Sequence, residues 1–391
     1  MSSSSLSKLC GKRDVKWRPK LVLHLQDAEG SIAEIRSSIL DFVYFAIQVG
    51  ASIILPRFTP RSEYGPSSSP NGTAPFDTFF DADYFISTLA SSCPELAIYR
   101  PENDEDMIPA LARTYLPRSM RTDIDPAKTP AASVQHFNAW LDGHSDLAEI
   151  TLVKIQRTLW QGPDTRSFPA HIRRDFGGLL RLNPTVRYLA AVATYNLAQR
   201  FHFPLDPKHA RYHNAFFGAH IQLATDAASS GSGSEANASG QADAYIQQAT
   251  THNLKIIYTA GFSMDDLEDL EKFADDAWTQ GGYIVTSAAY LLSSSQDDLK
   301  LFKGLDAVQR ELVDYAVLAR SSRFAGSVTS GFAWSVALGR SVLVEEEGRF
   351  REPLRLEPGD KDDGVALEDG LSMVWGRDKN RETSMIRGAW P

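Results

Sequence analysis

The chain has 391 residues, of which 43% are hydrophobic, 10% aromatic and 23% charged, with a formal net charge of −9. This length exceeds the roughly 250–300 residues at which one hydrophobic core stops growing, so two domains are expected. The negative charge argues against a nucleic acid or an anionic membrane as partner, and no run approaches the ~18 apolar residues that span a bilayer.

The N-terminal residues 1–19 are Ser-rich and basic, and we expect a flexible tail without the apolar core of a signal peptide. A cytoplasmic location is therefore expected, unless the natural N-terminus is longer, in which case the ER or Golgi lumen is the alternative. Asn71 and Asn237 are formal glycosylation acceptors only in that second case. Cys10 and Cys93 are too few for a disulfide framework or a cysteine-based metal site.

The first half of the chain begins with a βαβ pattern. Residues 20–26 predict a strand, Ser31 with Glu34 a capping box, and apolar residues at helical spacing a helix that ends at Gly50. Residues 52–58 predict the next parallel strand. The loop Asp27–Ser31 then lies at the carboxyl end of the first strand, where open α/β sheets bind ligands. Further elements are predicted as a strand at 95–100 and helices over 133–160 and 185–200.

Residues 202–213 interrupt this pattern with two prolines and a polar cluster, so we predict domains at 20–205 and 206–391. The second domain repeats the alternation of strands and helices. An irregular tail from about residue 348 is expected to wrap around it. Strands are predicted at 216–223, 255–260, 283–288, 323–328 and 341–346, and helices at 241–252, 263–278, 305–320 and 331–339.

Several common catalytic motifs are missing, including the G-x-S-x-G elbow, the Walker A loop and H-E-x-x-H. His209 and His213 have a spacing that can hold a metal on a helix, but a loop beside Pro207 more often carries solvated histidines. The D-A-D triplet at 81–83 lies in an aromatic run and is better interpreted as amphipathic packing. No metal site is predicted.

The stretch "RFAGSVTSGFAWSVALGR" (323–340) predicts a strand that passes through hydroxyl and small residues into a helix. Its turn contains Ser327, Thr329, Ser330, Gly331 and Phe332. Hydroxyls and backbone N–H groups at a helix N-terminus can bind an anion. The same residues are equally typical of a plain N-cap.

Three stretches resemble the O-fucosyltransferase-like glycosyltransferases, and the chain looks most similar to fungal members over residues 20–345. They are "GSIAEIR" (30–36), "GAHIQ" (218–222) and "VDYAVLARSSRFAGSVTSGFAWSVALGR" (313–340). The resemblance implies a GT-B fold, in which two doubly wound, Rossmann-like domains face each other across a cleft. The N-terminal domain would bind the acceptor and the C-terminal domain the GDP-sugar.

In activity, the resemblance implies transfer of fucose from GDP-fucose to an acceptor hydroxyl on a protein, glycan or small molecule. The sugar carbon would be inverted, and neither a metal nor a cofactor beyond the donor substrate would be needed. The partners implied are thus a nucleotide-sugar donor and a hydroxyl acceptor.

One departure concerns the residues that the resemblance implies for the donor. The family pattern His-x-Arg keeps His220, and Asp226 is also kept, but Gln222 stands where the arginine is implied to contact the donor phosphates. Glutamine can donate a hydrogen bond but lacks the charge and the bidentate geometry of arginine. Loss of one preorganised donor aimed at developing charge costs roughly 10²- to 10³-fold in rate.

The family pattern G-G-x-x-N-x-R is also altered. Gly30 and Arg36 remain, whereas Ser31 replaces a glycine and Glu34 an asparagine. A carboxylate close to a pyrophosphate repels it, although Glu34 can instead point back as the capping-box residue.

Two functional hypotheses follow. In the first, Arg36 and the turn at 327–332 hold the diphosphate, His220 orients the donor, and Glu34 or another carboxylate deprotonates the acceptor. In the second, the chain is a degenerate family member that binds a nucleotide, glycan or protein partner without turnover. Gln222 is the residue that discriminates between them.

Overall fold

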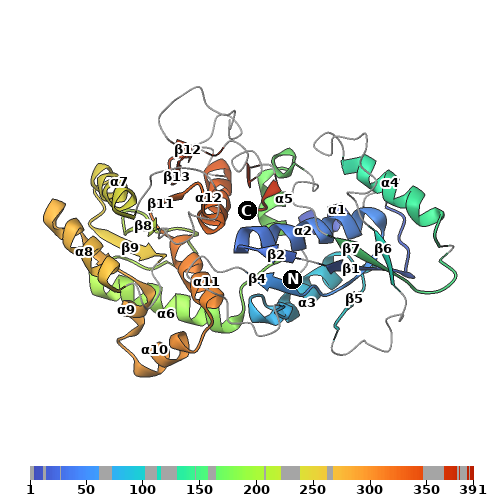
Figure 1. The fold of residues 1–391 in the computed structure, drawn as a ribbon, viewed down its shortest axis with the longest axis horizontal. Helices are drawn as coiled ribbons and strands as arrows, with labels where there is room; N and C mark the ends of the chain where they lie inside the picture. Colours follow the sequence, from blue (N-terminus) through green and yellow to red (C-terminus); the bar gives the residue numbers. More distant parts are fainter. Residues whose placement is uncertain are drawn as a thin grey trace. The chain divides into compact units, whose positions relative to one another are not determined.

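The computed structural model describes residues 4–11, 15–26, 28–60, 73–101, 112–115, 130–145, 147–156, 164–206, 208–221, 238–261, 267–346, 365–376, 378, 385–386 and 388–391. These residues form two compact units, each containing its own parallel sheet flanked by helices (Figure 1). The α/β class expected from the sequence is confirmed.

The first unit is built on a five-stranded parallel sheet with the order β5-β3-β1-β7-β6. The chain moves outward from β1 to β5 and then returns to the other side of β1, so the winding reverses between β1 and β7. Its strands are β1 (Leu21–Gln26), β3 (Ser52–Ile54), β5 (Ile98–Tyr99), β6 (Ala112–Tyr115) and β7 (Thr151–Gln156), beside the parallel pair β2 (Ala28–Gly30) and β4 (Phe58–Pro60). Its helices are α1 (Ser4–Cys10), α2 (Ile32–Val49), α3 (Ala82–Ser92), α4 (Pro130–Asp142) and α5 (Ala170–Gly177), with short 3₁₀ turns at Phe76–Thr78 and Thr165–Ser167.

The second unit contains a six-stranded sheet with the order β10-β9-β8-β11-β13-β12, in which only the β12–β13 pair is antiparallel. The winding reverses between β8 and β11. The strands are β8 (Phe217–His220), β9 (Ile256–Ala260), β10 (Ile284–Thr286), β11 (Arg323–Ser327), β12 (Val365–Glu368) and β13 (Ser372–Trp375). The helices are α6 (Pro184–Phe201), α7 (Ala238–Thr251), α8 (Leu267–Gly281), α9 (Ala288–Leu292), α10 (Gln296–Lys303), α11 (Ala307–Leu318) and α12 (Gly331–Glu346).

The two faces of β8 pack against different helices, because successive side chains of a strand point to opposite sides. Phe217 and Ala219 belong to the core that α7 and α8 complete. On the other face, Gly218 approaches Leu318 at the end of α11, and His220 stacks on Phe332 in α12. Figure 1 shows these helix pairs on either side of the sheet. The second unit is therefore doubly wound, with His220 on its α11–α12 side.

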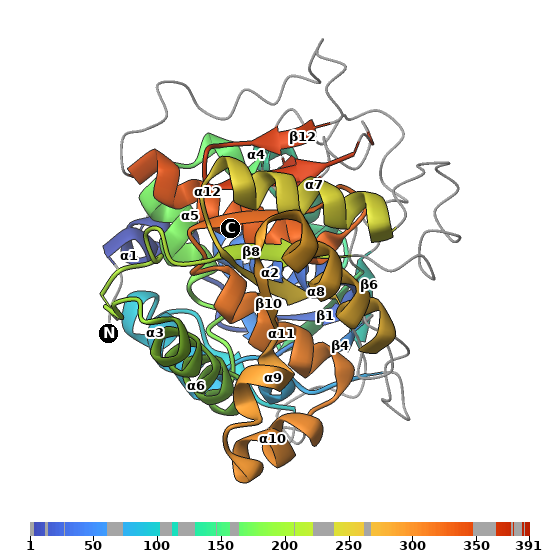
Figure 2. The same cartoon turned by 90° about the vertical axis from the view of Figure 1, so that its left-hand side faces the viewer.

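The boundary between the units lies between Arg181 and Leu182, so the boundary predicted at 205/206 was too late in the chain. Helix α6 belongs to the second unit because it packs on α9 and α11 there (Figures 1 and 2). The Asn196 side chain, for example, donates from Nδ2 to the Leu291 carbonyl at 2.9 Å. The C-terminal segment Ile386–Trp390 instead joins the first unit, where Trp390 Nε1 donates to Asp41 Oδ1 at 2.7 Å.

Three predicted elements differ from the structure. Within 133–160, helix α4 ends at Asp142 and the strand β7 follows, because Leu152 and Val153 are buried in a parallel sheet. Residues 341–346 continue helix α12 and do not form a strand. The tail is also more regular than expected, since β12 and β13 add an edge hairpin to the second sheet.

The N-terminal segment is tied to the first unit. Residues 4–10 form α1, in which Leu6 and Leu9 are buried, so the expected flexible tail is wrong for this part. Cys10 is joined to Cys93 by a disulfide with a Cα–Cα distance of 5.4 Å. Two cysteines do not make a disulfide framework, but they do make one long-range cross-link between α1 and the end of α3.

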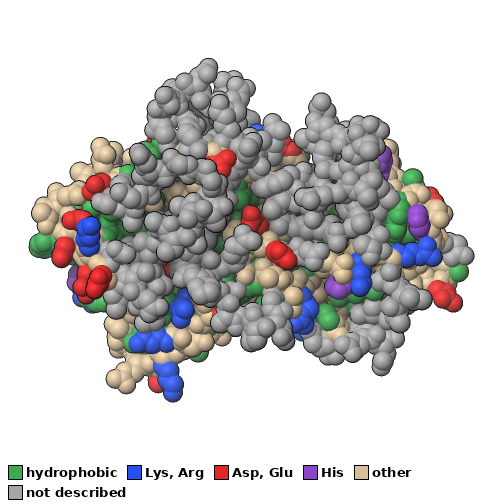
Figure 3. Space-filling view, in the orientation of Figure 1, with side chains coloured by type: hydrophobic (Ala, Val, Ile, Leu, Met, Phe, Trp, Pro, Cys, Tyr) green, Lys and Arg blue, Asp and Glu red, His purple; other side chains and the backbone are tan. Residues whose placement is uncertain are grey.

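The described surface carries charges of both signs. On the face shown in Figure 3, acidic and basic side chains lie intermixed between apolar and neutral polar ones. Among the helices that the structure describes, none combines the length and the apolar composition that crossing a bilayer requires.

Candidate functional site

The first candidate site lies in the second unit at the carboxyl ends of β8 and β11. These two strands are parallel neighbours, with Ala219 opposite Ala325, so His220 and Ser327 end adjacent strands. The winding of the sheet reverses between them. Open α/β sheets bind ligands at such a reversal, in the crevice beyond the carboxyl ends of the strands.

His220 is held as a neutral imidazole. Its side chain is 1% exposed, and its ring stacks on Phe332 with centroids 4.6 Å apart and an interplanar angle of 27°. Burial lowers the pKa of His220 to about 3, because the charged form loses its hydration. The ring is thus uncharged at neutral pH and too weak a base for proton abstraction there. It can orient a ligand by packing or hydrogen bonding.

The strand end that carries His220 is packed against its neighbours at close range. Tyr245 Oη on α7 donates to the His220 carbonyl at 3.1 Å. Gly261, which follows β9, has a φ of +106°, and a Cβ there would lie 1.8 Å from the Ile221 carbonyl oxygen. Only glycine permits this approach and this backbone conformation. The loop after β9 therefore fixes the chain just beyond His220.

The hydroxyl turn after β11 is ordered by its own hydrogen bonds. Ser327 Oγ and Thr329 Oγ1 are 2.8 Å apart, and the Thr329 backbone N–H donates to Ser327 Oγ at 3.3 Å. Ser330 is fully buried, and its Oγ accepts from the Ala333 N–H at 2.9 Å. Ser330 therefore caps α12, as the second interpretation of this turn predicts. Among the three hydroxyl residues, Thr329 is the most exposed.

Two tryptophans hold this turn in place, and the sequence alone gave no sign of either contact. Trp334 Nε1 donates to the Val328 carbonyl at 2.8 Å, and the Val328 N–H donates to the Trp375 carbonyl at 2.6 Å. The turn is thereby attached to α12 on one side and to β13 on the other. Trp334 is fully buried one turn into α12, a position from which the helical periodicity could have indicated a role in packing.

The second candidate site lies in the first unit at the N-terminus of α2. Gly30 has a φ of +121°, and a Cβ there would lie 2.1 Å from Glu34 Oε2. The same carboxylate oxygen accepts from the Ser31 N–H at 2.8 Å. Glu34 thus points back onto the start of its own helix, as the capping interpretation predicts. A carboxylate at this position is favourable for the helix and places negative charge where a phosphate would bind.

Arg36 is buried in the first unit, with 6% of its surface exposed. Its guanidinium is directed at the end of α5, where Nη1 donates to the Leu180 carbonyl at 3.4 Å and Nη2 to the Gly177 carbonyl at 3.5 Å. A cation is favourable beside the carbonyls of a helix C-terminus. In this structure Arg36 therefore helps to attach α2 to α5.

Gln222 and Asp226 lie outside the described residues.

The residues whose spacing can hold a metal make other contacts in the described structure. The Asp81 carboxylate caps α3 by accepting from the Tyr84 N–H at 3.0 Å, and Asp83 pairs with Arg100. His213 Nδ1 lies 3.1 Å from Arg211 Nη1, an unfavourable neighbour for a metal ion. No group of three or more His, Cys, Asp or Glu side chains suited to a metal occurs among the residues that the structure describes.

The two units thus define an α/β protein of the doubly wound type, with a candidate anion- or nucleotide-binding turn at the strand-order reversal of the second sheet. Residues 21–238 match the family described as GDP-fucose protein O-fucosyltransferase (O-FucT). The match covers more than half of the chain, and the chain belongs to this family. The family expected from the sequence is confirmed.

Solved structures similar to this chain include fucosyltransferases. POFUT1 in complex with GDP shares 9% sequence identity, with a TM-score of 0.48 over 83% of this chain and 96% of that one. The fucosyltransferase NodZ from Bradyrhizobium shares 13% identity, with a TM-score of 0.43 over 83% of this chain and 92% of that one. A comparison with curated proteins finds no significant match.

Proposed function

We propose that this chain transfers a sugar, fucose from GDP-fucose, to an acceptor hydroxyl, with its two units arranged as a GT-B fold. The supporting observation is the switch-point site of the second unit in a member of the O-FucT family. There a buried, neutral imidazole and a hydroxyl turn end two adjacent parallel strands. Under this proposal the second unit binds the nucleotide sugar and the first unit the acceptor.

In the proposed donor complex, the diphosphate lies over the turn between β11 and α12. Thr329 and Ser327 supply hydroxyls, and the backbone at Gly331 and the dipole of α12 favour negative charge. Ser330 contributes to diphosphate binding only indirectly, because its hydroxyl caps α12 and fixes the N-terminus of that helix. His220 and Phe332 form one wall of the donor site. Asp226 and Gln222 follow His220 in the sequence, and the family pattern assigns both positions to donor binding.

The proposed reaction is a single displacement that needs no metal. The acceptor oxygen attacks the anomeric carbon on the face opposite GDP, and the bond from that carbon to the β-phosphate oxygen breaks. The electron pair leaves with GDP, the acceptor proton passes to a carboxylate, and the sugar carbon is inverted. If Glu34 is this base, the proton is taken by Oε1, because Oε2 accepts from the Ser31 N–H.

A second candidate function is nucleotide, glycan or protein binding without turnover. It is favoured by the direction of the Arg36 guanidinium, which contacts the Gly177 and Leu180 carbonyls. It is also favoured by Gln222, which stands where the family has an arginine. Under this alternative, Gly30, Ser31 and Glu34 serve only to start helix α2.

Donor titration separates the two functions. GDP binding is measured by calorimetry, and GDP release from GDP-fucose is measured with and without EDTA. Thr329→Val should weaken GDP binding roughly tenfold or more, because a hydrogen bond to a charged group contributes about 1.5–3 kcal/mol. Thr251→Val is the matched control, since the Thr251 hydroxyl bonds to the Gln247 carbonyl of its own helix.

The titration distinguishes the enzyme from the non-catalytic alternative. GDP binding together with EDTA-resistant GDP release supports the metal-independent enzyme. Binding without release supports the non-catalytic alternative. An absence of GDP binding, or an equal effect of both threonine variants, would reject the donor site at the β8–β11 switch point.

We also propose that the chain matures in an oxidising compartment such as the ER lumen. The disulfide between Cys10 and Cys93 supports this alternative over the cytoplasm, because structural disulfides are rare in reducing compartments. Glycosylation of Asn71 or Asn237 in a eukaryotic expression host, detected by a mass shift on deglycosylation, would support the same location.

A further inference from the structure

An uncharged stripe runs along the outer side of helix α6 in the second unit. The inner side of this helix packs on α9 and α11 through buried residues such as Leu189 and Leu197. The outer residues, which follow one another at spacings of three and four, are Pro184, Tyr188, Ala191, Val192, Tyr195 and Gln199. They are called the α6 stripe below. A surface helix normally has charged residues on its outer side, so an uncharged, partly aromatic stripe indicates a contact surface.

Large apolar side chains gather around the α6 stripe. Tyr188 is 51% exposed and Tyr195 54%, and Tyr290 on α9 and Leu301 on α10 are exposed as well. Of the seven large apolar side chains that are exposed among the described residues, these are four. Figures 1 and 2 show α6, α9 and α10 side by side. Apolar residues that are exposed together, unlike single ones, are typical of a protein interface.

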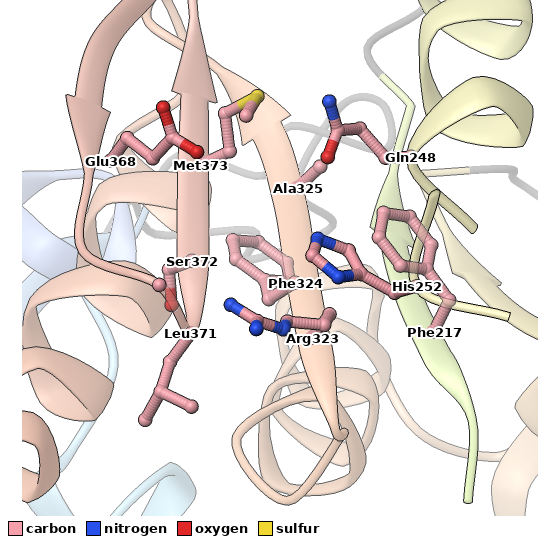
Figure 4. A pocket seen from close by; sticks show the side chains of 11 residues that line it. Phe217, Gln248, His252, Arg323, Phe324, Ala325, Glu368, Leu371, Ser372 and Met373 are labelled. Carbon is pink, nitrogen blue, oxygen red and sulfur yellow. The ribbon is translucent and has the colours of Figure 1, made fainter. Parts of the chain in front are cut away.

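The α6 stripe is a helix face and not a ligand pocket. The pocket shown in Figure 4 lies at the amino ends of β8, β11 and β13, and none of its lining residues belongs to α6, α9 or α10. Small molecules bind in concave sites that enclose most of their surface. A helix face instead fits the face of another helix, because the side chains of the two can interdigitate.

The edge of the stripe beside α9 and α10 has acidic groups at one end and a basic group at the other. At the N-terminal end, Tyr188 Oη donates to Asp298 Oδ1 at 2.9 Å. The pKa of Tyr188 is raised, first by this hydrogen bond and further by the charges of Asp298 and Asp297, so both carboxylates lie close to the tyrosine. At the C-terminal end, the Arg200 guanidinium lies over the Tyr290 ring, 4.6 Å from its centroid. About 18 Å of helix separates Tyr188 from Arg200.

We propose that the α6 stripe is the contact surface of a homodimer, in which the α6 helices of two copies pack antiparallel about a two-fold axis near the middle of the stripe. In a two-fold contact each surface meets a copy of itself, so its two ends must complement each other. Tyr188 of one copy then packs on Tyr195 of the other, and Arg200 of one copy lies opposite Asp298 of the other. A parallel pair would instead bring the two acidic ends to the same level.

The test measures the molar mass of the full chain by light scattering during size-exclusion chromatography, at about 5–100 μM, a range in which a weak interface dissociates. The wild type should approach twice the 43.2 kDa of one chain at the upper concentration. Tyr195→Arg should raise the dissociation constant at least tenfold, because it places a charge within the apolar contact. Trp278→Arg on α8 is the matched control, since Trp278 is 65% exposed but does not belong to the stripe, and should leave the mass unchanged.

A charge exchange tests the antiparallel arrangement. Arg200→Glu and Asp298→Arg should each weaken the dimer, because like charges then face each other across the axis. The double variant Arg200→Glu/Asp298→Arg should recover it, because the two ends again carry opposite charges. Lys272→Glu on α8 is the charge control and should have no effect. The proposal is overturned if the double variant is no better than the single ones, or if Tyr195→Arg and Trp278→Arg change the mass equally. It is also overturned if the wild type keeps the mass of one chain at about 100 μM, which would assign the stripe to a different protein or to a glycan.

Discussion

The disulfide between Cys10 and Cys93 is expected to be the largest single contribution to the stability of the first unit. Both half-cystines are buried, at 4% and 0% exposure, and 83 residues separate them in the chain. Closing a loop of this length restricts the unfolded chain by about 15 cal/mol/K, or about 4.5 kcal/mol at 25 °C. Domains are stable by only about 5–15 kcal/mol, so a contribution of this size is a large fraction of the stability expected for such a unit.

We compare the wild-type protein, with its disulfide intact or reduced, with the double variant Cys10→Ala/Cys93→Ala. In urea unfolding, the oxidised protein should exceed the reduced one by about 3–5 kcal/mol in free energy of unfolding, with the change confined to the first unit. The double variant should be insensitive to reductant. Its packing loss is separated from the cross-link by comparing it with the reduced wild type, which keeps both sulfur atoms in place.

Two results would contradict a stabilising role of the disulfide. The first is the finding of two free thiols by mass spectrometry after alkylation of the protein purified without reductant. The second is a difference below about 1 kcal/mol between the oxidised and reduced forms, which would mean that the unfolded chain is already restricted around this loop.

Gln222→Arg should raise GDP-fucose turnover by roughly 10²- to 10³-fold if only the phosphate-binding charge is missing, and a loss of melting temperature without a gain in GDP binding would contradict this. Arg340→Met should destabilise the second unit by about 3–5 kcal/mol in urea, because it leaves the carbonyls of Ala319 and Ser321, which accept from Nη1 at 2.9 and 2.8 Å, without this donor. Arg310→Met should cost less than about 1 kcal/mol. Because the pKa of His220 is lowered from 6.5 to about 3 on folding, the unfolded state binds the extra proton and stability is lost as pH falls from about 6.5 toward 3. His220→Gln should reduce the slope of unfolding free energy against pH by up to about 1.4 kcal/mol per pH unit in that window, and an unchanged slope would show that the ring is accessible to protons in the folded state.

Helices and strands whose ends are marked by local sequence signals were predictable from the sequence. Helix α2 begins with the capping pair Ser31 and Glu34 and ends at Gly50, as its residues indicate. The strand β7 was missed although Asp142, Gly143 and Ser145 mark a turn after helix α4 and the run TLVKIQ contains three β-branched residues. Conversely, a strand was predicted at 341–346 where the structure has a helix. The β-branched residues Val342 and Val344 favour a strand, but their burial on the faces of α12 outweighs this intrinsic preference for extended backbone.

The candidate site was predictable in its residue types and only partly in their roles. Sequence identified His220 and the hydroxyl turn, yet it left open whether Ser330 binds an anion or caps α12. That choice depends on the depth to which Ser330 is buried, which no local pattern contains. The disulfide and the contacts of Arg340 join residues distant in sequence, so only the folded chain reveals them.

The electrostatics of the two switch points favour the second unit as the one that holds the diphosphate. At the start of α2, the Glu34 carboxylate already occupies the N-terminus of the helix and accepts from the Ser31 N–H. A second anion there would meet an existing negative charge at close range. At the start of α12, the groups in the turn are the neutral hydroxyls of Ser327, Thr329 and Ser330. Because a helix N-terminus favours one negative group, the terminus that lacks a carboxylate of its own is the better diphosphate site. Glu34→Gln should therefore leave GDP affinity unchanged, and a tenfold tighter GDP complex in that variant would assign the diphosphate to α2 instead.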